Sequence, residues 1–515
     1  MDISILGLDF KKMNTPFPLL RAKVSSQEWR ETSLAIAELH GRLVTLWATQ
    51  TSTNRFLVSV VFSAGDLGLI LLELPLNSHT ETYPELSSLF PCAKRMQRTV
   101  WDLMGIRANG AEDNRPWLNH GTWPENYFPL LKNNSGDEMV ADPQNDEYPF
   151  VQVEGEGVHE IAVGPVHAGV IEPGHFRFSV VGEKTLRLEE RLGYAHKGVD
   201  KKFEEFSASE GHRLAGRISG DSTVSYAWAY CMAVESAWGW KVPARALWLR
   251  ALLLERERIA NHLGDLGSLG NDAGFGFGLT QFMRLKEDWL RVSKDIFNHR
   301  FMMDCILPGG VNIDIEDEDC QVLLNQCQFV QEQVQILRGI YDDHAGLQDR
   351  FLFAGTVSLD VALELGLTGL AGRASGVLED ARVIGATCPY TEIEVNIAGS
   401  TRGDVAARVS VRFEEIFESI RLIRKIIEKL PNGNIFVAGN GIQPKAFGAG
   451  WVEGWRGGIF VAVNTSKGGK IERCHVHDPS WQNWPVLEFA VIGDIVPDFP
   501  LINKSFNLTY SGHDR

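Results

Sequence analysis

Two distant stretches of the chain each carry a pair of polar residues separated by two positions. RISGDS holds Ser219 and Ser222, and DPSWQN holds Ser480 and Asn483. This is the spacing of the C-x-x-C pairs that bind metals and redox clusters, yet none of the four positions is a cysteine. The four positions offer hydroxyl and amide groups in place of thiols, so their spacing alone does not decide which chemistry they serve.

A loop rich in glycine and proline carries a second group of reactive side chains. The stretch GPVHAGVIEPGHFRF, residues 164–178, places His167, Glu172 and His175 just before a predicted strand. Glycine and proline fix a tight backbone that lets another group approach closely. The stretch is typical of a substrate loop, and equally of a surface turn whose histidines are satisfied locally.

Three titratable residues share one face of a strongly apolar helical segment. In LLLERERIANHL, residues 252–263, Glu255, Arg258 and His262 follow one another at intervals of three and four, so they lie on one helix face. Such a row suits a proton relay or a buried ion network. A solvated polar stripe is the alternative.

Two further stretches resemble binding motifs only superficially. GNDAGFGFGLTQF, residues 270–282, lacks the G-x-G-x-x-G spacing and a preceding strand, so we expect a flexible loop around Asp272 rather than a nucleotide site. In CHVHD, His475 and His477 share one face of a predicted strand while Cys474 lies on the other. With no second histidine pair, we interpret this stretch as a polar strand face and predict no metal site.

The composition excludes several classes of protein. The chain has 515 residues and a formal net charge of -16, which argues against nucleic acid as a partner. Its seven cysteines are scattered without a C-x-x-C, so we expect a reducing compartment and no iron–sulfur cluster held by this chain. The beginning of the sequence lacks the pattern of a secretory signal, and no apolar run approaches the ~20 residues of a membrane span. We therefore expect a soluble chain that docks on a membrane complex.

The distribution of periodic patterns divides the chain in two. An acidic, polar seam lies within residues 132–150 and predicts a linker. Before it, residues 1–131 carry strand runs at 42–49 and 56–62, which predict a small α+β domain. After it, residues 151–515 predict a larger, mainly helical domain with β segments at its start and end. The segments that support this second domain are a hairpin at 175–193 turning at VGEK, long helices at 242–267 and 408–433, and a strand at 457–465. The predicted fold class is α+β.

Several of these stretches together resemble one superfamily, the large subunits of [NiFe] hydrogenases and the quinone-site subunit of respiratory complex I. They run in order over most of residues 151–515: GPVHAGVIEPGHFRF, RLGYAHKGVDKKFE, VPARALWLRALLLERERIANHLGDLG, FMMDCILPGGV, GRASGV and DFPLINKSFNLTYSGHDR. The first domain, with TVWDLMGIRANG, resembles the small subunit that neighbours this one in complex I. The presence of both domains on one chain is similar to the large subunit of formate hydrogenlyase.

The resemblance gives the four polar positions a meaning. Hydrogenases of this type bind nickel and iron with a C-x-x-C and a D-P-C-x-x-C, which fall here on Ser219 and Ser222 and on Ser480 and Asn483. Serine stays protonated and asparagine cannot ionise, so the soft thiolate site is lost. In complex I the same cavity receives a quinone head group. The resemblance thus implies a cavity lined by Arg217, Ser219, Ser222, Ser480 and Asn483.

Further site residues follow from the same resemblance. His167 matches the first histidine of the complex I loop, and the second falls at about Pro173, with Glu172 or His175 near enough to substitute. Asp272 matches the carboxylate that pairs with that second histidine. We therefore expect His167 and Asp272 to be catalytic. Residues of the helical row are expected to couple proton movement to a membrane arm: Glu255, Arg258 and His262.

The leading hypothesis is an electron-transfer subunit of a complex I-like oxidoreductase on the inner face of a prokaryotic membrane. A [4Fe-4S] cluster in a small partner subunit would supply electrons, quinone would accept them, and membrane-arm subunits would complete the assembly. The resemblance also implies NADH dehydrogenase-type activity with NAD, although no residue here indicates a nicotinamide site. The alternatives are a non-catalytic scaffold derived from a hydrogenase, and a hydrogenase with unusual ligands.

Overall fold

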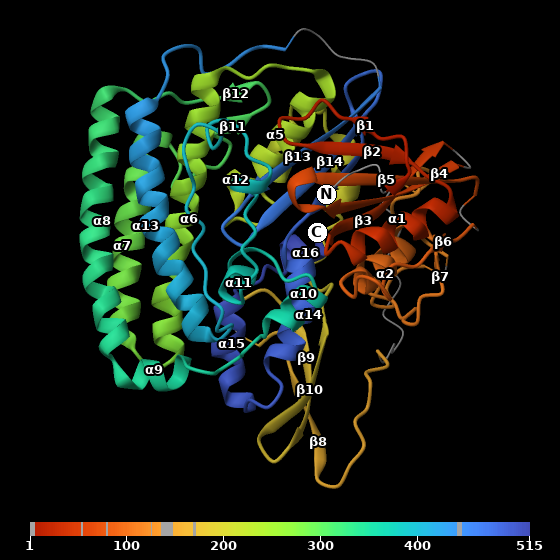
Figure 1. The fold of residues 1–515 in the computed structure, drawn as a ribbon, viewed down its shortest axis with the longest axis horizontal. Coiled ribbons are helices and arrows are strands. Elements are labelled where there is room, and N and C mark those ends of the chain that lie inside the picture. Colours follow the sequence, from red (N-terminus) through yellow and green to blue (C-terminus); the bar gives the residue numbers. More distant parts are fainter. Residues whose placement is uncertain are drawn as a thin grey trace.

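The computed structural model describes residues 6–52, 55–78, 81–124, 126–134, 148–167, 171–439 and 445–515. Its elements form three parts (Figure 1). An N-terminal sheet with two helices lies at one end, a layer of long helices lies at the other, and C-terminal strands and helices lie between them. The predicted α+β class is confirmed.

The N-terminal part is a mixed five-stranded sheet. Among its described strands, only the pairing of β2 with β5 is parallel. The strands occur in the order β1-β2-β5-β4-β3, with the bounds Lys11–Lys12, Leu19–Lys23, Leu69–Leu76, Arg55–Ser63 and Arg42–Ser52. The predicted strands at 42–49 and 56–62 are therefore confirmed. Apolar residues on the inward faces of β3 to β5 are almost completely buried, and this burial holds the sheet to its neighbours.

Two helices complete this part of the molecule. Helix α1 (Ser26–Glu38) begins at a capping box, in which the side chains of Ser25 and Glu28 satisfy each other's backbone N–H groups. Helix α2 (Ala93–Met104) ends at Gly105 in the left-handed conformation that favours glycine. A short parallel pair, β6 (Tyr83–Pro84) and β7 (Ala108–Asn109), brackets α2.

The second predicted domain begins with a small antiparallel sheet that projects from the rest of the molecule (Figure 1). Strand β9 (His175–Val181) lies between β8 (Val158–Val163) and β10 (Lys184–Arg191). The predicted hairpin at 175–193, with its turn at VGEK, is thus confirmed. Most of the predicted linker, residues 135–147, lies outside the described residues.

Long helices build the opposite end of the molecule. The layer contains α6, α7, α8 and α13, and α5 joins it to the C-terminal strands (Figure 1). The bounds are Thr223–Trp238 for α5, Ala244–Asp272 for α6, Gly276–Phe297 for α7, Asp317–Asp343 for α8 and Val405–Lys429 for α13. The two long helices expected from the sequence are present. Helix α6 is nearly all buried because other elements cover it on every side.

The flexible loop expected around Asp272 is a wrong prediction. Helix α6 continues to Asp272, and after a short turn α7 begins at Gly276. The glycines of this stretch serve close packing instead. A Cβ at Gly270 would lie 2.3 Å from the hydroxyl of Tyr341, and one at Gly278 would lie 2.4 Å from it. Glycine therefore lets α6 and α7 approach the same tyrosine.

The C-terminal part returns to the N-terminal sheet. Strands β13 (Ala446–Glu453), β14 (Gly458–Thr465) and β15 (Ile471–His477) form an antiparallel sheet that packs on α5. After it come α14 (Ser480–Ala490), α15 (Phe499–Phe506) and α16 (Ser511–Asp514). His475 of β15 stacks on Trp47 of β3 at 4.5 Å between ring centroids. One continuous apolar core therefore spans both predicted domains.

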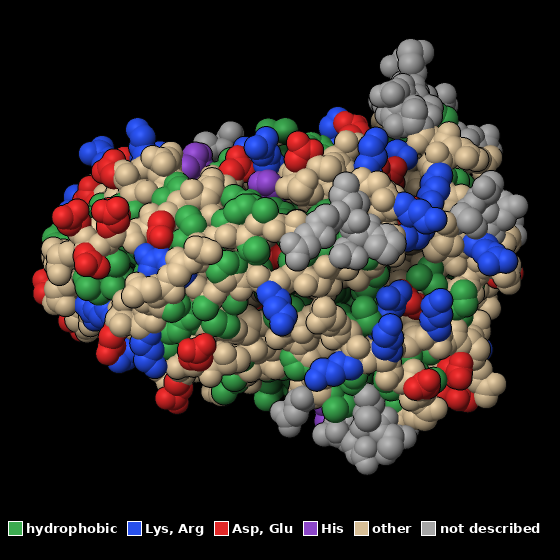
Figure 2. All heavy atoms as spheres, turned by 90° about the horizontal axis from the view of Figure 1, so that it is seen from above, with side chains coloured by type: hydrophobic (Ala, Val, Ile, Leu, Met, Phe, Trp, Pro, Cys, Tyr) green, Lys and Arg blue, Asp and Glu red, His purple; other side chains and the backbone are tan. Residues whose placement is uncertain are grey.

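Short elements join these parts. They are η2 (Gly65–Leu67), α3 (Val199–Lys202), η3 (Phe203–Glu205), α4 (Gly211–Ala215), β11 (Ile306–Leu307), β12 (Gly310–Val311), α9 (Ala345–Phe351), α10 (Leu359–Glu364), α11 (Gly369–Ala374), α12 (Ala381–Ile384) and η4 (Val496–Asp498). Over the described ranges, every helix falls short of the length and apolarity that a membrane crossing needs. Figure 2 shows side chains of both charges interspersed over the helical end of one face.

Candidate functional site

The first serine pair surrounds a carboxylate. Ser219 Oγ donates to Asp221 Oδ1 over 2.7 Å, and Ser222 Oγ donates to the same oxygen over 3.1 Å. Arg456 closes the group with a two-point ion pair, at 2.9 Å from Oδ1 and 2.6 Å from Oδ2. Bidentate pairing of this kind fixes both side chains in one geometry.

The second pair reaches the first through Thr509. Its hydroxyl donates to Ser219 Oγ over 3.3 Å, and its backbone N–H donates to Ser480 Oγ over 3.1 Å. Ser480 is the first residue of α14, and Asn483 lies one turn further along it. The fold therefore connects Ser219, Ser222 and Ser480 in one hydrogen-bonded cluster, although they come from distant segments. We call Ser219, Asp221, Ser222, Arg456, Ser480 and Thr509 the serine cluster.

Asn483 joins this region through the backbone. Its amide oxygen accepts from the N–H of Thr368, and its amide nitrogen donates to the carbonyl of the same residue. The next residue, Gly369, has a φ of +64°, and a Cβ there would lie 1.8 Å from the carbonyl oxygen of Arg456. Only glycine permits this approach, which brings the Asn483 side of the site against the backbone of Arg456.

The charge of the serine cluster is fixed by its ion pair. Burial would raise the pKa of Asp221, but the charge and hydrogen bonds of Arg456, with those of the two serines, hold the pKa well below its ordinary value. Asp221 is thus a carboxylate at any physiological pH. The cluster consequently presents hydroxyl groups around a neutralised ion pair.

This donor set does not fit nickel and iron. Three of the four positions that the resemblance assigns to hydrogenase cysteines offer a hydroxyl or amide that already serves an internal hydrogen bond, and Ser480 Oγ accepts one from Thr509. Neither group becomes a soft anion near neutral pH. Within the described ranges, no group of three or more His, Cys, Asp and Glu side chains is arranged to hold a metal ion. No chemical step is therefore derived through such a centre.

Arg217 is not brought into the serine cluster. Its side chain is exposed and forms a two-point ion pair with Asp304, at 2.7 Å in both contacts. It therefore lies on the surface beside the cluster and does not share the hydrogen bonds of Ser219.

The two residues expected to be catalytic lie apart in their contacts. His167 packs against Phe176 and Tyr510, while its Nδ1 lies 3.3 Å from the carbonyl of Pro165. Asp272 lies at the end of α6, where neighbouring groups remove part of the hydration of its carboxyl although the residue as a whole is exposed. This partial desolvation raises the carboxyl pKa, and the charge of Lys504 partly opposes the rise. No hydrogen bond joins the two across the part of the chain that the structure describes.

Glu172 provides the link from the loop to the C-terminal segment. Its Oε2 accepts from the backbone N–H of Ser511 over 3.0 Å. His175 lies at the start of β9, where its Nδ1 is 3.3 Å from the carbonyl of Gly164. The loop is thus anchored beside the segment that carries Thr509.

The helical row lies in a buried ion network rather than on a solvated stripe. Glu255 accepts from Tyr390 and Ser419, each at 2.6 Å, and pairs with Arg382 at 3.1 Å. Burial would raise the pKa of Glu255, but the charges of Arg382 and Arg258 lower it. The acidic and basic members of the network are Glu255, Asp380, Glu415, Glu453, Arg258, Arg373 and Arg382.

His262 is the member of the row that can change its charge by taking up a proton. Its Nε2 lies 2.8 Å from Glu415 Oε2, while its Nδ1 is buried without a hydrogen-bond partner among the described residues. Burial lowers the pKa of His262, and the bond to Glu415 opposes this only in part. The imidazole is consequently neutral at neutral pH, and protonating it requires a change in its surroundings.

A polar path connects the network to the serine cluster. Arg456 Nε donates to the carbonyl of Asn507, whose amide donates to Asp265 over 2.6 Å. Asp265 pairs with Arg412 at 2.9 Å, and burial, together with the charge of Arg412, lowers the pKa of His262. The serine cluster and the helical row thus belong to one continuous polar region.

Sequence reasoning missed Asp221, Arg456 and Glu257. Asp221 lies between the two serines of RISGDS, and this position was the available signal. Glu257 caps the start of α5 by accepting from the N–H groups of Val224 and Ser225. Burial raises its pKa to about 8, and the charge of Asp221 adds to the rise. Nothing in the local sequence distinguishes it from Glu255.

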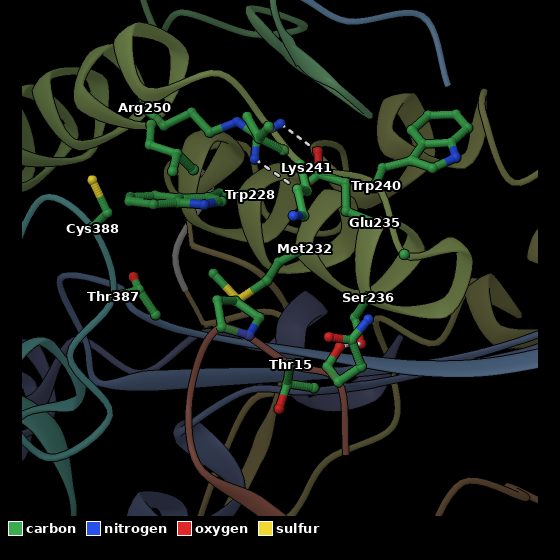
Figure 3. A pocket seen from close by; sticks show the side chains of 15 residues that line it. Thr15, Trp228, Met232, Glu235, Ser236, Trp240, Lys241, Arg250, Thr387 and Cys388 are labelled. Carbon is green, nitrogen blue, oxygen red and sulfur yellow. Dashed lines mark hydrogen bonds and ion pairs between the residues drawn. The ribbon is translucent and has the colours of Figure 1, made fainter. Parts of the chain in front are cut away.

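A separate cavity of about 270 Å³ lies between the N-terminal segment and helices α5 and α6. Figure 3 shows Trp228 edge-on beside Cys388, with Met232 below it and Lys241 between Trp228 and Glu235. Its wall contains a buried ion pair, in which Arg250 Nη2 lies 2.6 Å from Glu235 Oε1. The cavity therefore offers a mainly apolar wall, and its described lining contains no unpaired buried charge.

Two segments of the chain match families of known proteins. Residues 22–139 match the family described as "Respiratory-chain NADH dehydrogenase, 30 Kd subunit". Residues 272–449 match "Respiratory-chain NADH dehydrogenase, 49 Kd subunit". The chain thus joins a region like the first subunit to a region like the second, and we call them the N-terminal region and the C-terminal region. The predicted resemblance to the two complex I subunits is thereby confirmed.

Hydrogenase subunits resemble the same chain. Formate hydrogenlyase subunit 5 of Escherichia coli (strain K12) is 29% identical over 450 residues, which cover 87% of this chain and 79% of the relative. An NADH-quinone oxidoreductase subunit of Saccharopolyspora erythraea is 26% identical, covering 69% of this chain and 89% of the relative. The chain is homologous to both groups.

One solved structure shares the fold of most of the chain. A chain of the membrane-bound sulfane sulfur reductase, an archaeal respiratory membrane complex, matches with a TM-score of 0.66 and 25% identity. The match covers 70% of this chain and 99% of the other. The serine cluster and part of the ion network lie outside residues 272–449, in the segments that flank the C-terminal region.

Proposed function

We propose that this chain is an electron-transfer subunit of a complex I-like, hydrogenase-related oxidoreductase attached to a membrane. Electrons would come from a [4Fe-4S] cluster in a small partner subunit and pass to quinone or a related acceptor bound beside the serine cluster. Similarity to subunits of both complex I and membrane-bound hydrogenases supports this proposal. The observation that carries it is the hydrogen-bonded polar cluster that contains Ser219, Ser222 and Ser480, three of the four positions that the resemblance assigns to metal-binding cysteines.

The polar cluster suits a neutral acceptor that becomes charged on reduction. Ser219, Ser222 and Thr509 supply hydroxyl groups, and the guanidinium of Arg456, whose charge Asp221 balances, donates to Ser222 beside them. Polar groups that are already positioned in this way stabilise an oxygen anion that forms as electrons arrive. His167 and Asp272 are proposed to serve the acceptor from the loop and from the end of α6.

The ion network is proposed to couple reduction to proton movement. Arginines stay protonated, so Glu255, Arg258 and the other ion pairs would act as fixed charges, while His262 changes its proton. A new negative charge at the serine cluster would act on His262 through the same buried region, where interactions are weakly screened. Membrane-arm subunits would receive this change.

The electron donor and the acceptor are open to more than one chemistry. NADH and quinone follow from the names of the complex I relatives, and NAD itself would bind to another subunit. The solved structure of similar fold is named for sulfane sulfur reduction, so the proposal includes acceptors other than quinone. Peripheral attachment to the inner face of a prokaryotic membrane belongs to the same proposal.

A non-catalytic scaffold is the second candidate. It is favoured by Asn483, whose amide is wholly engaged with the backbone of Thr368, as in a purely structural position. The two candidates differ in what happens when groups near the acceptor are changed without affecting assembly.

Substitution of Asp272 separates the two candidates. In the purified complex, Asp272→Asn should lower the rate of acceptor reduction on the order of 10²-fold, as is typical when a proton-transferring group is removed. Ser219→Ala should lower it by a smaller factor. Asp288→Asn, an exposed carboxylate on α7, is the matched control and should leave the rate unchanged. Full turnover in the Asp272 variant would favour the scaffold.

Metal content tests the loss of the hydrogenase site directly. Elemental mass spectrometry of the purified complex should find iron from partner clusters and no nickel assigned to this chain. Nickel near one atom per chain would contradict the loss of the metal site at the four replaced positions and restore hydrogen chemistry as the leading function.

A further inference from the structure

A second cavity, of about 500 Å³, lies where the N-terminal region meets the small β8–β10 sheet. Its described lining comes from three separate segments of the chain. They contribute Pro116 and His120, then Tyr148, Pro149 and Phe150, and finally His175, Arg177, Arg191 and Tyr194. No residue of the serine cluster belongs to this described lining, so the cavity is distinct from the proposed acceptor site.

Arg191 gives the cavity a buried positive charge. The residue is only 4% exposed, and its guanidinium donates to the carbonyls of Pro116, Trp117 and Asn119. No carboxylate of the described residues forms an ion pair with it. The charge of Asp102 acts on Arg191 without contacting it, and its carboxylate accepts from backbone N–H groups at positions 117, 118 and 119.

A buried cation without a contacting anion is costly. Burial lowers the pKa of Arg191 to about 10, with Arg98 adding to this effect and Asp102 opposing it. Proteins ordinarily pair such a charge or give it a ligand. Backbone carbonyls supply hydrogen bonds but no net negative charge, so the cavity retains a positive potential.

The other polar groups of the cavity have the same sign or are neutral. Arg177 lines it from β9 and pairs only at its exposed side, with Glu160 at 3.0 Å. Burial lowers the pKa of His120 to about 4 and also lowers that of His175, so both are neutral at neutral pH. Among the described lining residues there is no Asp or Glu.

Aromatic rings hold these cations in place. Arg191 lies over the ring of Tyr148 at 4.4 Å, and Arg177 lies over the ring of Phe150 at 4.7 Å. Tyr148 is itself fixed, because its hydroxyl accepts from Arg98 over 2.6 Å. Two guanidinium groups are therefore positioned before any ligand arrives, which reduces the ordering cost of binding.

We propose that this cavity binds a small-molecule oxyanion, a carboxylate or a phosphate ester, with Arg177 and Arg191 as its charge partners. Planar guanidinium groups match the paired oxygens of both anions. The volume exceeds that of inorganic phosphate, so the ligand carries an organic body that lies against Tyr148 and Tyr194. Because the lining comes from both sides of the predicted linker, the bound anion would connect the N-terminal region to the small β8–β10 sheet.

Calorimetric titration of the full chain tests the site, with inorganic phosphate, benzoate and adenosine monophosphate as probes. Binding by benzoate but not by the phosphates assigns the site to carboxylates, and the reverse assigns it to phosphates. Arg177→Gln should weaken the binding of the effective probe at least tenfold. Glu160→Gln, which frees Arg177 from its exposed partner, should strengthen it.

Arg187→Gln is the matched control, since Arg187 lies on β10 outside the described lining and is partly exposed; it should leave the affinity unchanged. Arg177 makes fewer structural contacts than Arg191, so its variant is expected to fold, and a melting scan without probe verifies this. Absence of binding by all three probes, or equal affinity in the Arg177→Gln and Arg187→Gln variants, would overturn the proposal.

Discussion

Asp221 shows how one residue organises the candidate site. Two serines and Arg456 converge on its carboxylate, and no other charge of the cluster needs to move when a ligand enters. In a hydrogenase, four thiolates would have to balance a metal. Here the ion pair balances itself, so the hydroxyl groups lie in a cluster without net charge, which suits a neutral molecule beside it.

The residues around Asp221 also define how far the sequence alone can lead. Spacing and resemblance identified Ser219, Ser222, Ser480 and Asn483, which lie close together in the fold. Arg217 fits the motif equally well, yet its side chain turns to the surface and pairs with Asp304. Arg456 was out of reach because its position beside Asp221 depends on a turn between β13 and β14, far away in the sequence.

Glu257 provides a prediction at the scale of one residue. Its folded pKa of about 8 lies above the ordinary value of 4.5, so the folded state holds a proton that the unfolded state releases between these pH values. Stability contributed by this group is full below about pH 4.5 and is lost as the pH rises to about 8. The slope is on the order of 1 kcal/mol per pH unit.

Glu257→Gln should remove this slope. Denaturant unfolding measured between pH 5 and pH 9 should show the wild type losing stability with rising pH more steeply than the variant, because glutamine cannot release a proton. Equal slopes in the two proteins would mean that Glu257 titrates normally, and its role beside Asp221 would have to be abandoned.

At the scale of elements, helix α6 carries the row Glu255, Arg258 and His262, and helix α13 carries two of its partners, Glu415 and Ser419. The sequence predicted both helices because their apolar residues recur at the helical period. It left open whether the row on α6 faces water. The row is buried, because Arg373 on α11 and Arg382 on α12 pair with the glutamates of the ion network. Both arginines lie far from α6 in the sequence.

Glu415 on α13 tests this network. Glu415→Gln keeps the shape but leaves Arg373, at 2.7 Å, and Arg258 with less negative charge in a fully buried site. Breaking such a buried pair costs about 3–5 kcal/mol. The free energy of unfolding should fall by this amount, as measured by denaturant titration.

The neighbouring Glu414 provides the matched control on the same helix. It pairs with Arg338 on the surface, where its side chain is 47% exposed, so Glu414→Gln should change stability by about 1 kcal/mol or less. A similar small loss in both variants would show that the ion network contributes little to holding α6 and α13 together.

At the scale of the molecule, the two predicted regions form a single body. Arg95 on α2 pairs with Glu190 at 2.9 Å and with Glu488 at 2.7 Å, and both glutamates belong to the second predicted domain, residues 151–515. Gln482 on α14 donates to the carbonyl of Leu43 on β3. The division at residues 132–150 could be proposed from composition, but these cross-contacts could not, because they join residues between 95 and 439 positions apart in the sequence.

This interface predicts that the two regions stay together without the covalent link. A protease site placed within residues 135–147 allows the full chain to be cut after folding. The two pieces should elute together in size-exclusion chromatography, because the apolar core is continuous across them. Arg95→Met should make the cut protein separate, since Glu190 would be left buried and unpaired. Lys94→Met, at the exposed neighbouring position of α2, should not. Separation of the cut wild type would instead mean that the linker holds the regions together.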